Sequence, residues 1–325
     1  MMIVTSIYSI VDGLFVSNFV GLTPFAAVNL IMPFLMIVGS AGFMFGTGGS
    51  ALVAKTMGEG KKEKANRIFS LLVYSAAAVG VIFTVLGIIF LRPISAFLGA
   101  EGELLENCVL YGSIYLLAMP FFILPYEFQS FFVTAEKPRL GLLVTVAAGV
   151  ANIILDALFV AVLRWGLAGA ALATAVSVFV GGAVPIIYFA RENTGLFRLG
   201  KTQFDIKALL KACVNGSSEL MSNISISIVS MLYNFRLNSY AGENGIAAYG
   251  VMMYVNMIFF AAFVGYSVGT APVTSYHYGA QNKDELKSLL KKSSIIISIF
   301  SVSMFILAQV LAVPLRKCLQ VTTGS

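Results

Sequence analysis

The chain has 325 residues, of which 58% are hydrophobic and only 11% are charged, and its net charge is +6. A soluble domain carries about 25% charged residues, so this composition cannot cover a water-facing surface of that size and excludes an ordinary soluble globular protein. The mean hydropathy of +0.90 instead indicates a protein that is embedded in a membrane.

Hydropathy predicts nine membrane-spanning helices, because each apolar run is long enough to cross a hydrocarbon layer of about 30 Å. Their approximate limits are 1–20, 26–54, 69–91, 107–134, 140–163, 167–190, 209–238, 246–275 and 293–315. The longest polar connection, about 191–211, lies between the sixth and seventh spans. It predicts a boundary between two lobes.

Basic residues gather in alternate loops. One set holds Lys55, Lys61, Lys62, Lys64, Arg67, Lys137, Arg139, Arg191, Arg198, Lys201, Lys207, Lys211, Lys283, Lys287, Lys291 and Lys292. The other holds only Arg92, Arg164, Arg236, Arg316 and Lys317, beside Glu101, Glu103 and Glu106. Basic loops stay in the cytoplasm, so the N-terminus and the 192–211 connection are predicted to be cytoplasmic. The net positive charge is therefore read as a topology signal and not as a nucleic-acid-binding surface.

The chain resembles itself at an offset of 221 residues, over about residues 6 to 64. Ser6 falls on Ser227, Gly21 on Gly242, Gly48 on Gly269, Gly58 on Gly279 and Lys62 on Lys283. Both copies place their basic turn on the same side of the membrane, so the repeat is parallel, as in some transporters. This predicts an all-α membrane protein, a polytopic helical bundle of two parallel-repeat lobes.

The N-terminal lobe would comprise residues 1–191 with helices one to six, followed by the connection 192–211. The C-terminal lobe, 212–325, would hold only helices seven to nine. By symmetry, the complete protein is expected to have two lobes of six helices each. About nine of these twelve helices are present here.

Ionisable side chains within membrane spans are costly and usually mark ion or substrate paths. The spans contain Asp12, Glu127, Asp156 and Glu219. Asn152 and Asp156 are four residues apart, on one helix face. A carboxylate pair with an amide can hold a dehydrated Na⁺, or the pair can share a proton. The alternatives are a purely structural Asp156, a Glu219 that reaches the inner surface, and a Glu127 that pairs with a lysine or faces a watery cavity.

Enzymatic chemistry finds little support. His277 is the only histidine, and Cys108, Cys213 and Cys318 show no metal-ligand spacing, so neither an enzyme nor a cofactor is predicted. The stretch Gly46-Thr47-Gly48-Gly49-Ser50 lacks the ending of a phosphate-binding loop and predicts close helix packing, as do the pairs Gly42/Gly46 and Gly265/Gly269. A membrane-embedded enzyme or a pore remains an alternative of another class.

Four stretches resemble the multidrug and toxic compound extrusion (MATE) family, within it the MepA-like bacterial branch. They are Val11-Asp12-Gly13-Leu14-Phe15-Val16, Gly58-Glu59-Gly60-Lys61-Lys62, the run from Asn152-Ile153-Ile154-Leu155-Asp156 to Gly166-Leu167-Ala168-Gly169-Ala170-Ala171-Leu172-Ala173-Thr174, and Ser275-Tyr276-His277-Tyr278-Gly279-Ala280-Gln281-Asn282. The resemblance covers the whole chain, and relative to the family the sequence looks truncated at both ends.

The resemblance implies a monomeric secondary transporter of the bacterial inner membrane that exports amphipathic, often cationic drugs by antiport with Na⁺ or H⁺. It also implies a first-lobe cation site, with possible Na⁺, at Asp12, Asn152, Asp156 and Thr174, and a second-lobe acid at Glu219. The closest alternative is a lipid-linked oligosaccharide flippase, which would need cationic residues in its cavity. In the sequence, Arg236, near the outer end of the seventh predicted span, is the only basic residue close to the depth of such a cavity.

Overall fold

The fold is taken from a computed structural model that describes residues 1–192 and 195–322. Within these ranges, side chains are not described at residues 17, 22, 231, 234–235, 237–239, 241–259, 307–308 and 310–322. Every regular element in the described residues is a helix, which confirms the predicted all-α class. Residues Met1–Ala280 form one compact unit and Gln281–Ser325 another. The division into repeat lobes at 192–211 remains a prediction.

The first unit begins with α1 (Met2–Phe15), which continues as a π-helical segment, Val16–Val20. The second span comprises α2 (Leu22–Gly39), α3 (Ala41–Phe43), a π-helical segment Met44–Gly48 and α4 (Gly49–Gly58). The third span is α5 (Lys62–Phe97). The remaining elements are α6 (Gly102–Leu117), α7 (Met119–Thr134), α8 (Pro138–Asp156) with a π-helical segment Ala157–Val162, α9 (Gly166–Ala190) and α10 (Ile206–Gly279). The second unit is α11 (Lys283–Thr322).

Six helices of the described residues are long and apolar enough to cross a membrane, and one bent pair qualifies as a seventh span. These elements agree with predicted spans one to six and nine. The fourth span, predicted as one helix over 107–134, is broken: α6 and α7 meet at an angle of 58°. Pro120 lies in the first turn of α7 and cannot donate the backbone hydrogen bond that would continue α6.

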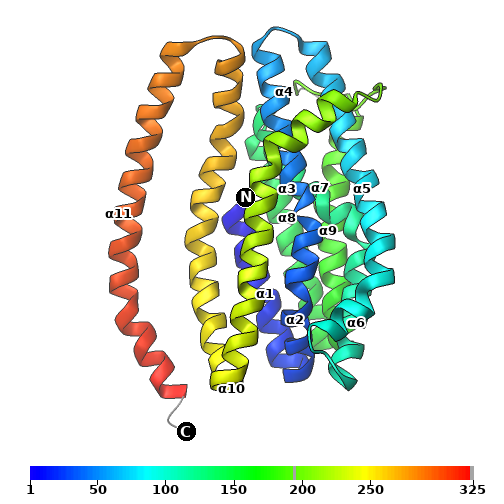
Figure 1. Cartoon of the computed structure of the whole chain (residues 1–325), viewed down its shortest axis with the longest axis vertical. Coiled ribbons are helices and arrows are strands. Elements are labelled where there is room, and N and C mark those ends of the chain that lie inside the picture. Colours follow the sequence, from blue (N-terminus) through cyan, green and yellow to red (C-terminus); the bar gives the residue numbers. More distant parts are fainter. Residues whose placement is uncertain (193–194, 323–325) are drawn as a thin grey trace. The chain divides into compact units, whose positions relative to one another are not determined.

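The seventh and eighth spans were predicted as separate helices with a break between residues 238 and 246. The structure instead assigns helix throughout α10, which Figure 1 shows as two arms joined at one end. The contacts of α10 require the chain to reverse its direction within this element. Gly216 packs on the Met44 backbone and Gly279 on the Lys55 backbone. A straight helix would separate the two glycines by roughly 95 Å, whereas Met44 and Lys55 are separated by about 17 Å.

Aromatic side chains fill the core of the first unit near the start of α5. Phe69 is fully buried and its ring lies 4.9 Å from that of Phe131, 5.0 Å from Phe189 and 5.4 Å from Phe197. The opposite face of α5 exposes Val81, Val85 and Ile89. An exposed apolar helix face of this length suits contact with lipid.

Candidate functional site

Two carboxylates from different helices meet inside the first unit. Asp12 lies on α1 and Asp156 is the last residue of α8, and these helices pack on each other. The two carboxyl groups lie within electrostatic range of one another. The exposed fraction is 9% for Asp12 and 0% for Asp156, so burial penalises the charged form of both groups.

Asn152 completes this group from the same face of α8. It is 1% exposed. Buried atoms without a hydrogen-bond partner include Asp12 Oδ1, both Asp156 carboxylate oxygens, and the Asn152 Oδ1 and Nδ2 atoms. Buried polar atoms are normally satisfied, and a set of orphaned oxygens in one place requires an explanation such as an ion or a proton. Carboxylate and amide oxygens suit a hard cation.

Tyr111 on α6 was not predicted and joins the site. It is fully buried and lies within electrostatic range of both Asp12 and Asp156. Its hydroxyl is also among the buried atoms without a hydrogen-bond partner. The ring stacks on Tyr115, with the centroids 6.0 Å apart. In the sequence, two tyrosines spaced by four residues in an apolar span carried no signal that distinguished them from packing residues.

Thr174 lies at the edge of the group. Its side chain is beside that of Tyr111, and its hydroxyl donates to the Ala170 carbonyl on α9 at 3.1 Å. Because the Thr174 hydroxyl donates its proton to Ala170, its oxygen can still accept a hydrogen bond from the Tyr111 side. The structure thus brings Asp12 and Asp156 together, places buried Asn152 one turn before Asp156 on α8, and brings in Thr174 through Tyr111.

Each acid is followed by a π-helical segment. Val16–Val20 begins four residues after Asp12, and Ala157–Val162 begins directly after Asp156. The two segments contact each other. π-helical turns are rare and are frequent at functional sites, because the wider turn redirects side chains and loosens the backbone hydrogen bonding.

A small cavity of about 40 Å³ lies between α1, α7, α8 and α9. Its lining includes Tyr8, Gln129 and Thr145, and Tyr8 lies within electrostatic range of Asp12. A water needs about 10–15 Å³ of such space, whereas drug-sized ligands need some 300 Å³ or more. The cavity is thus of the size for water and too small for a drug, and neither Asp12 nor Asp156 lines it.

The other two acids lie outside this group. Glu219 is half-buried on α10, in the arm that starts at Ile206. Glu127 on α7 is fully buried, and neither of its oxygens has a hydrogen-bond partner. Within the described residues, no lysine forms an ion pair with Glu127. Its backbone packs against Gly46, in agreement with the close packing predicted for Gly42 and Gly46. That prediction is wrong for Gly269, where no atom of the described residues lies within 4 Å of an added Cβ atom.

Within the described residues, no three histidine, cysteine, aspartate or glutamate side chains gather in a way that could hold a metal ion.

Comparisons with known proteins agree with this architecture. The MatE family model matches residues 1–158 and 220–323. The multidrug export protein MepA of Staphylococcus haemolyticus (strain JCSC1435) is 28% identical over 309 residues, which are 93% of this chain and 68% of that protein. MepA of Staphylococcus aureus (strain MRSA252) is 26% identical over 303 residues, 92% of this chain and 66% of its own length.

Solved structures share the fold. An outward-facing multidrug resistance MATE family transporter of the MOP superfamily superimposes with a TM-score of 0.90 at 22% identity, over 98% of this chain and 72% of that one. A MATE P26A mutant gives a TM-score of 0.88 at 23% identity, over 96% and 71% of the two chains.

Proposed function

Since the chain belongs to the MatE family, we propose that it exports amphipathic, often cationic organic compounds across the cytoplasmic membrane by antiport with Na⁺ or H⁺. The observation that carries the coupling part of this proposal is the buried pair Asp12 and Asp156, whose oxygens lack partners beside Asn152. The similarity to multidrug exporters favours export over the flippase and enzyme alternatives.

In this proposal the acid pair is the cation site. A Na⁺ held by Asp12, Asn152 and Asp156 would satisfy the oxygens that lack hydrogen-bond partners. Alternatively, a proton shared between the two carboxyl groups would neutralise one of their charges in place of the Na⁺. Tyr111 and Thr174 close the site from α6 and α9. Glu219 is the candidate acid of the second lobe.

Coupling requires only that the cation and the drug favour different conformers of the protein. The cation would stabilise one arrangement of the helices around the acid pair, and the drug would bind better to the other. The antiport direction then follows from the cation gradient.

The test is efflux of a fluorescent organic cation from cells that express the protein, with a Na⁺ gradient and a pH gradient imposed separately. Export that responds to one gradient identifies the coupling ion. Export that is absent under both gradients, in cells where the protein reaches the membrane, contradicts the proposal.

The proposed orientation places the N-terminus and residues 192–211 in the cytoplasm. The support is the one-sided distribution of lysine and arginine among the loops.

A further inference from the structure

A second cavity lies at the end of the first unit where α4 turns into α5. Its volume is about 640 Å³, within the range of roughly 300–1,000 Å³ that is usual for small-molecule sites. One wall is the turn and first part of α5, including Lys62, Lys64 and Arg67. The other is the chain just before α10, from Thr202 to Asp205.

The second wall is tied to α5 by specific hydrogen bonds. The Arg198 N–H donates to Asn66 Oδ1 at 2.8 Å, and the Gly200 N–H donates to Ser70 Oγ at 3.2 Å. The Thr202 hydroxyl donates to the Arg67 carbonyl at 2.9 Å. Because these bonds join residues more than 120 positions apart in sequence, they define the cavity as part of the tertiary structure.

The cavity lining carries excess positive charge. It contains Lys61, Lys62, Lys64 and Arg67 against two carboxylates, Glu63 and Asp205. The backbone N–H groups of Lys207 and Ala208 both donate to Asp205 Oδ1, as the N-cap of α10.

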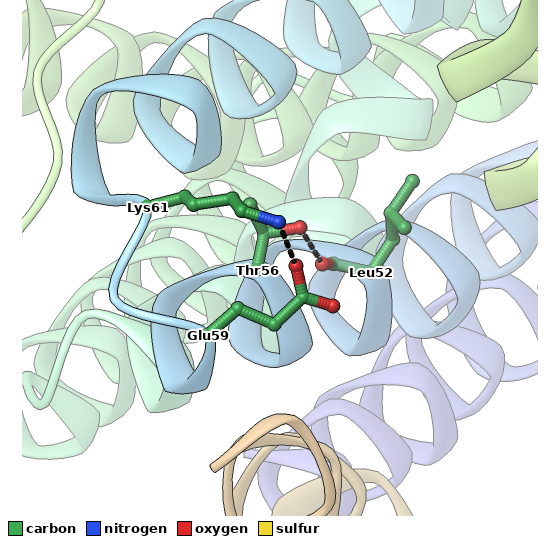
Figure 2. A network of polar contacts seen from close by, with 4 residues as sticks. All are labelled: Leu52, Thr56, Glu59 and Lys61. Carbon is green, nitrogen blue, oxygen red and sulfur yellow. Dashed lines mark hydrogen bonds and ion pairs between the residues drawn. The ribbon is translucent and has the colours of Figure 1, made fainter.

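Lys61 is already paired with a carboxylate outside the lining. Its Nζ atom lies 2.8 Å from Glu59 Oε2. Figure 2 shows this ion pair beside the hydrogen bond from the Thr56 hydroxyl to the Leu52 carbonyl. This ammonium group holds the pKa of Glu59 below its usual value. Lys62, Lys64 and Arg67 form no ion pair within the described part of the chain. The N-terminus of α5 at Lys62 adds further positive potential.

The floor of the cavity is apolar. Ile68 and Leu71 line it and are both 5% exposed. A free inorganic anion would gain nothing from such a floor, whereas a molecule with an anionic head and an apolar body would contact both parts. The site also lies at the end of a membrane span, where lipid headgroups are located.

We propose that this cavity binds the phosphate headgroup of an anionic phospholipid, with Lys62, Lys64 and Arg67 on the phosphate and Ile68 and Leu71 against the start of the acyl chains. Lysine and arginine clusters at the ends of membrane spans bind such headgroups by charge-assisted hydrogen bonds. The proposal does not depend on transport activity, because it concerns binding to the purified protein.

The experiment measures lipid binding to the detergent-solubilised protein by native mass spectrometry. Phosphatidylglycerol, phosphatidylcholine and inorganic phosphate are titrated separately. We expect phosphatidylglycerol to bind about tenfold or more tightly than phosphatidylcholine, and the triple variant Lys62→Gln/Lys64→Gln/Arg67→Gln to lose that preference. The matched control is Lys287→Gln/Lys291→Gln/Lys292→Gln on α11, which removes the same charge from residues that do not line the cavity and should keep the preference for phosphatidylglycerol.

A salt titration of the unaltered protein provides a second measurement that needs no variant: the preference for phosphatidylglycerol should disappear in about 1 M salt. Equal binding of the two lipids, or equal loss in both triple variants, would overturn the proposal. So would inorganic phosphate that binds as tightly as phosphatidylglycerol, since the site would then be one for a free anion.

Discussion

Gly58 and Gly279 meet where α4 crosses the end of α10, and their contacts are reciprocal. A Cβ atom added to Gly58 would lie 3.0 Å from the Tyr276 carbonyl carbon, and one added to Gly279 would lie 2.9 Å from the Lys55 carbonyl carbon. Both pairs, Gly58 with Gly279 and Lys55 with Tyr276, are related by the 221-residue offset of the repeat. Reciprocal contacts of equivalent residues are the pattern that a two-fold axis produces.

The first prediction concerns this crossing. Gly58→Ala and Gly279→Ala should each destabilise the protein by about 1–3 kcal/mol, because the added methyl group would meet backbone atoms that cannot rotate away. Thermal unfolding of the purified variants in detergent measures the effect.

The matched control is Gly269→Ala. Gly269 also lies on α10, but in the described part of the chain no atom lies within 4 Å of an added Cβ atom. Alanine there should be neutral or should stabilise the helix by up to about 1 kcal/mol. If all three variants unfold at the same temperature, the close crossing of α4 and α10 is wrong.

The second prediction concerns the acid pair. Asp12→Asn and Asp156→Asn should each reduce gradient-driven export about tenfold or more, because either change removes a charge that makes cation binding depend on the gradient. Membrane insertion should be unaffected. The control Glu103→Gln removes an exposed acid in the first turn of α6 and should leave export unchanged. Normal export by both asparagine variants would show that the cation site is elsewhere.

The third prediction separates stability from binding at Tyr111. Tyr111→Phe should keep the thermal stability of the protein, because within the described residues the buried hydroxyl makes no hydrogen bond that the change would remove. It should weaken cation binding about tenfold, the effect of losing one bond to a charged group. The control is Tyr126→Phe at a half-buried tyrosine that packs on Phe43 and Phe122, and it should change neither quantity. Titration of the cation against unfolding temperature measures both quantities.

The fourth prediction concerns orientation. A single cysteine at exposed Lys201 should react with an impermeant thiol reagent only after the cell membrane is opened, whereas one at Glu103 should react in intact cells. The three native cysteines are replaced first. Labelling of position 201 from outside would reverse the proposed topology.

The fifth prediction concerns the chain segment before α10. Asn66→Ala removes the acceptor of the Arg198 N–H, at a cost of about 1 kcal/mol, so hydrogen exchange at that amide should accelerate about fivefold. The Gly200 amide, held by Ser70 Oγ, should exchange at an unchanged rate if the two bonds are independent. Asn29→Ala, which removes only a bond within α2, should alter neither amide.

Much of this fold could be predicted from the sequence because lipid imposes a simple rule on helices. Apolar runs gave the spans, and Asp12 and Asp156 stood out because charges are rare at such depth. Pro120 indicates a bend point in the fourth span, but the angle of 58° at the break between Leu117 and Met119 could not be predicted, since hydropathy reports average environment and not direction. Tyr111 was missed for a related reason: a tyrosine in a span is not costly, and only its neighbours reveal its role.

The hydrogen bonds between the segment before α10 and α5 set a limit on how the protein can move. Thr202 is fixed to Arg67, and Asp205 already caps α10, so only two residues between them are unattached. That stretch can extend by about 10 Å at most. While these bonds persist, the start of α10 can pivot about the start of α5 but cannot slide away along it. Any rearrangement that separates α10 from α5 is therefore a rotation about the Thr202–Arg67 bond. Its largest displacement lies at the end of the helices that is farthest from this bond.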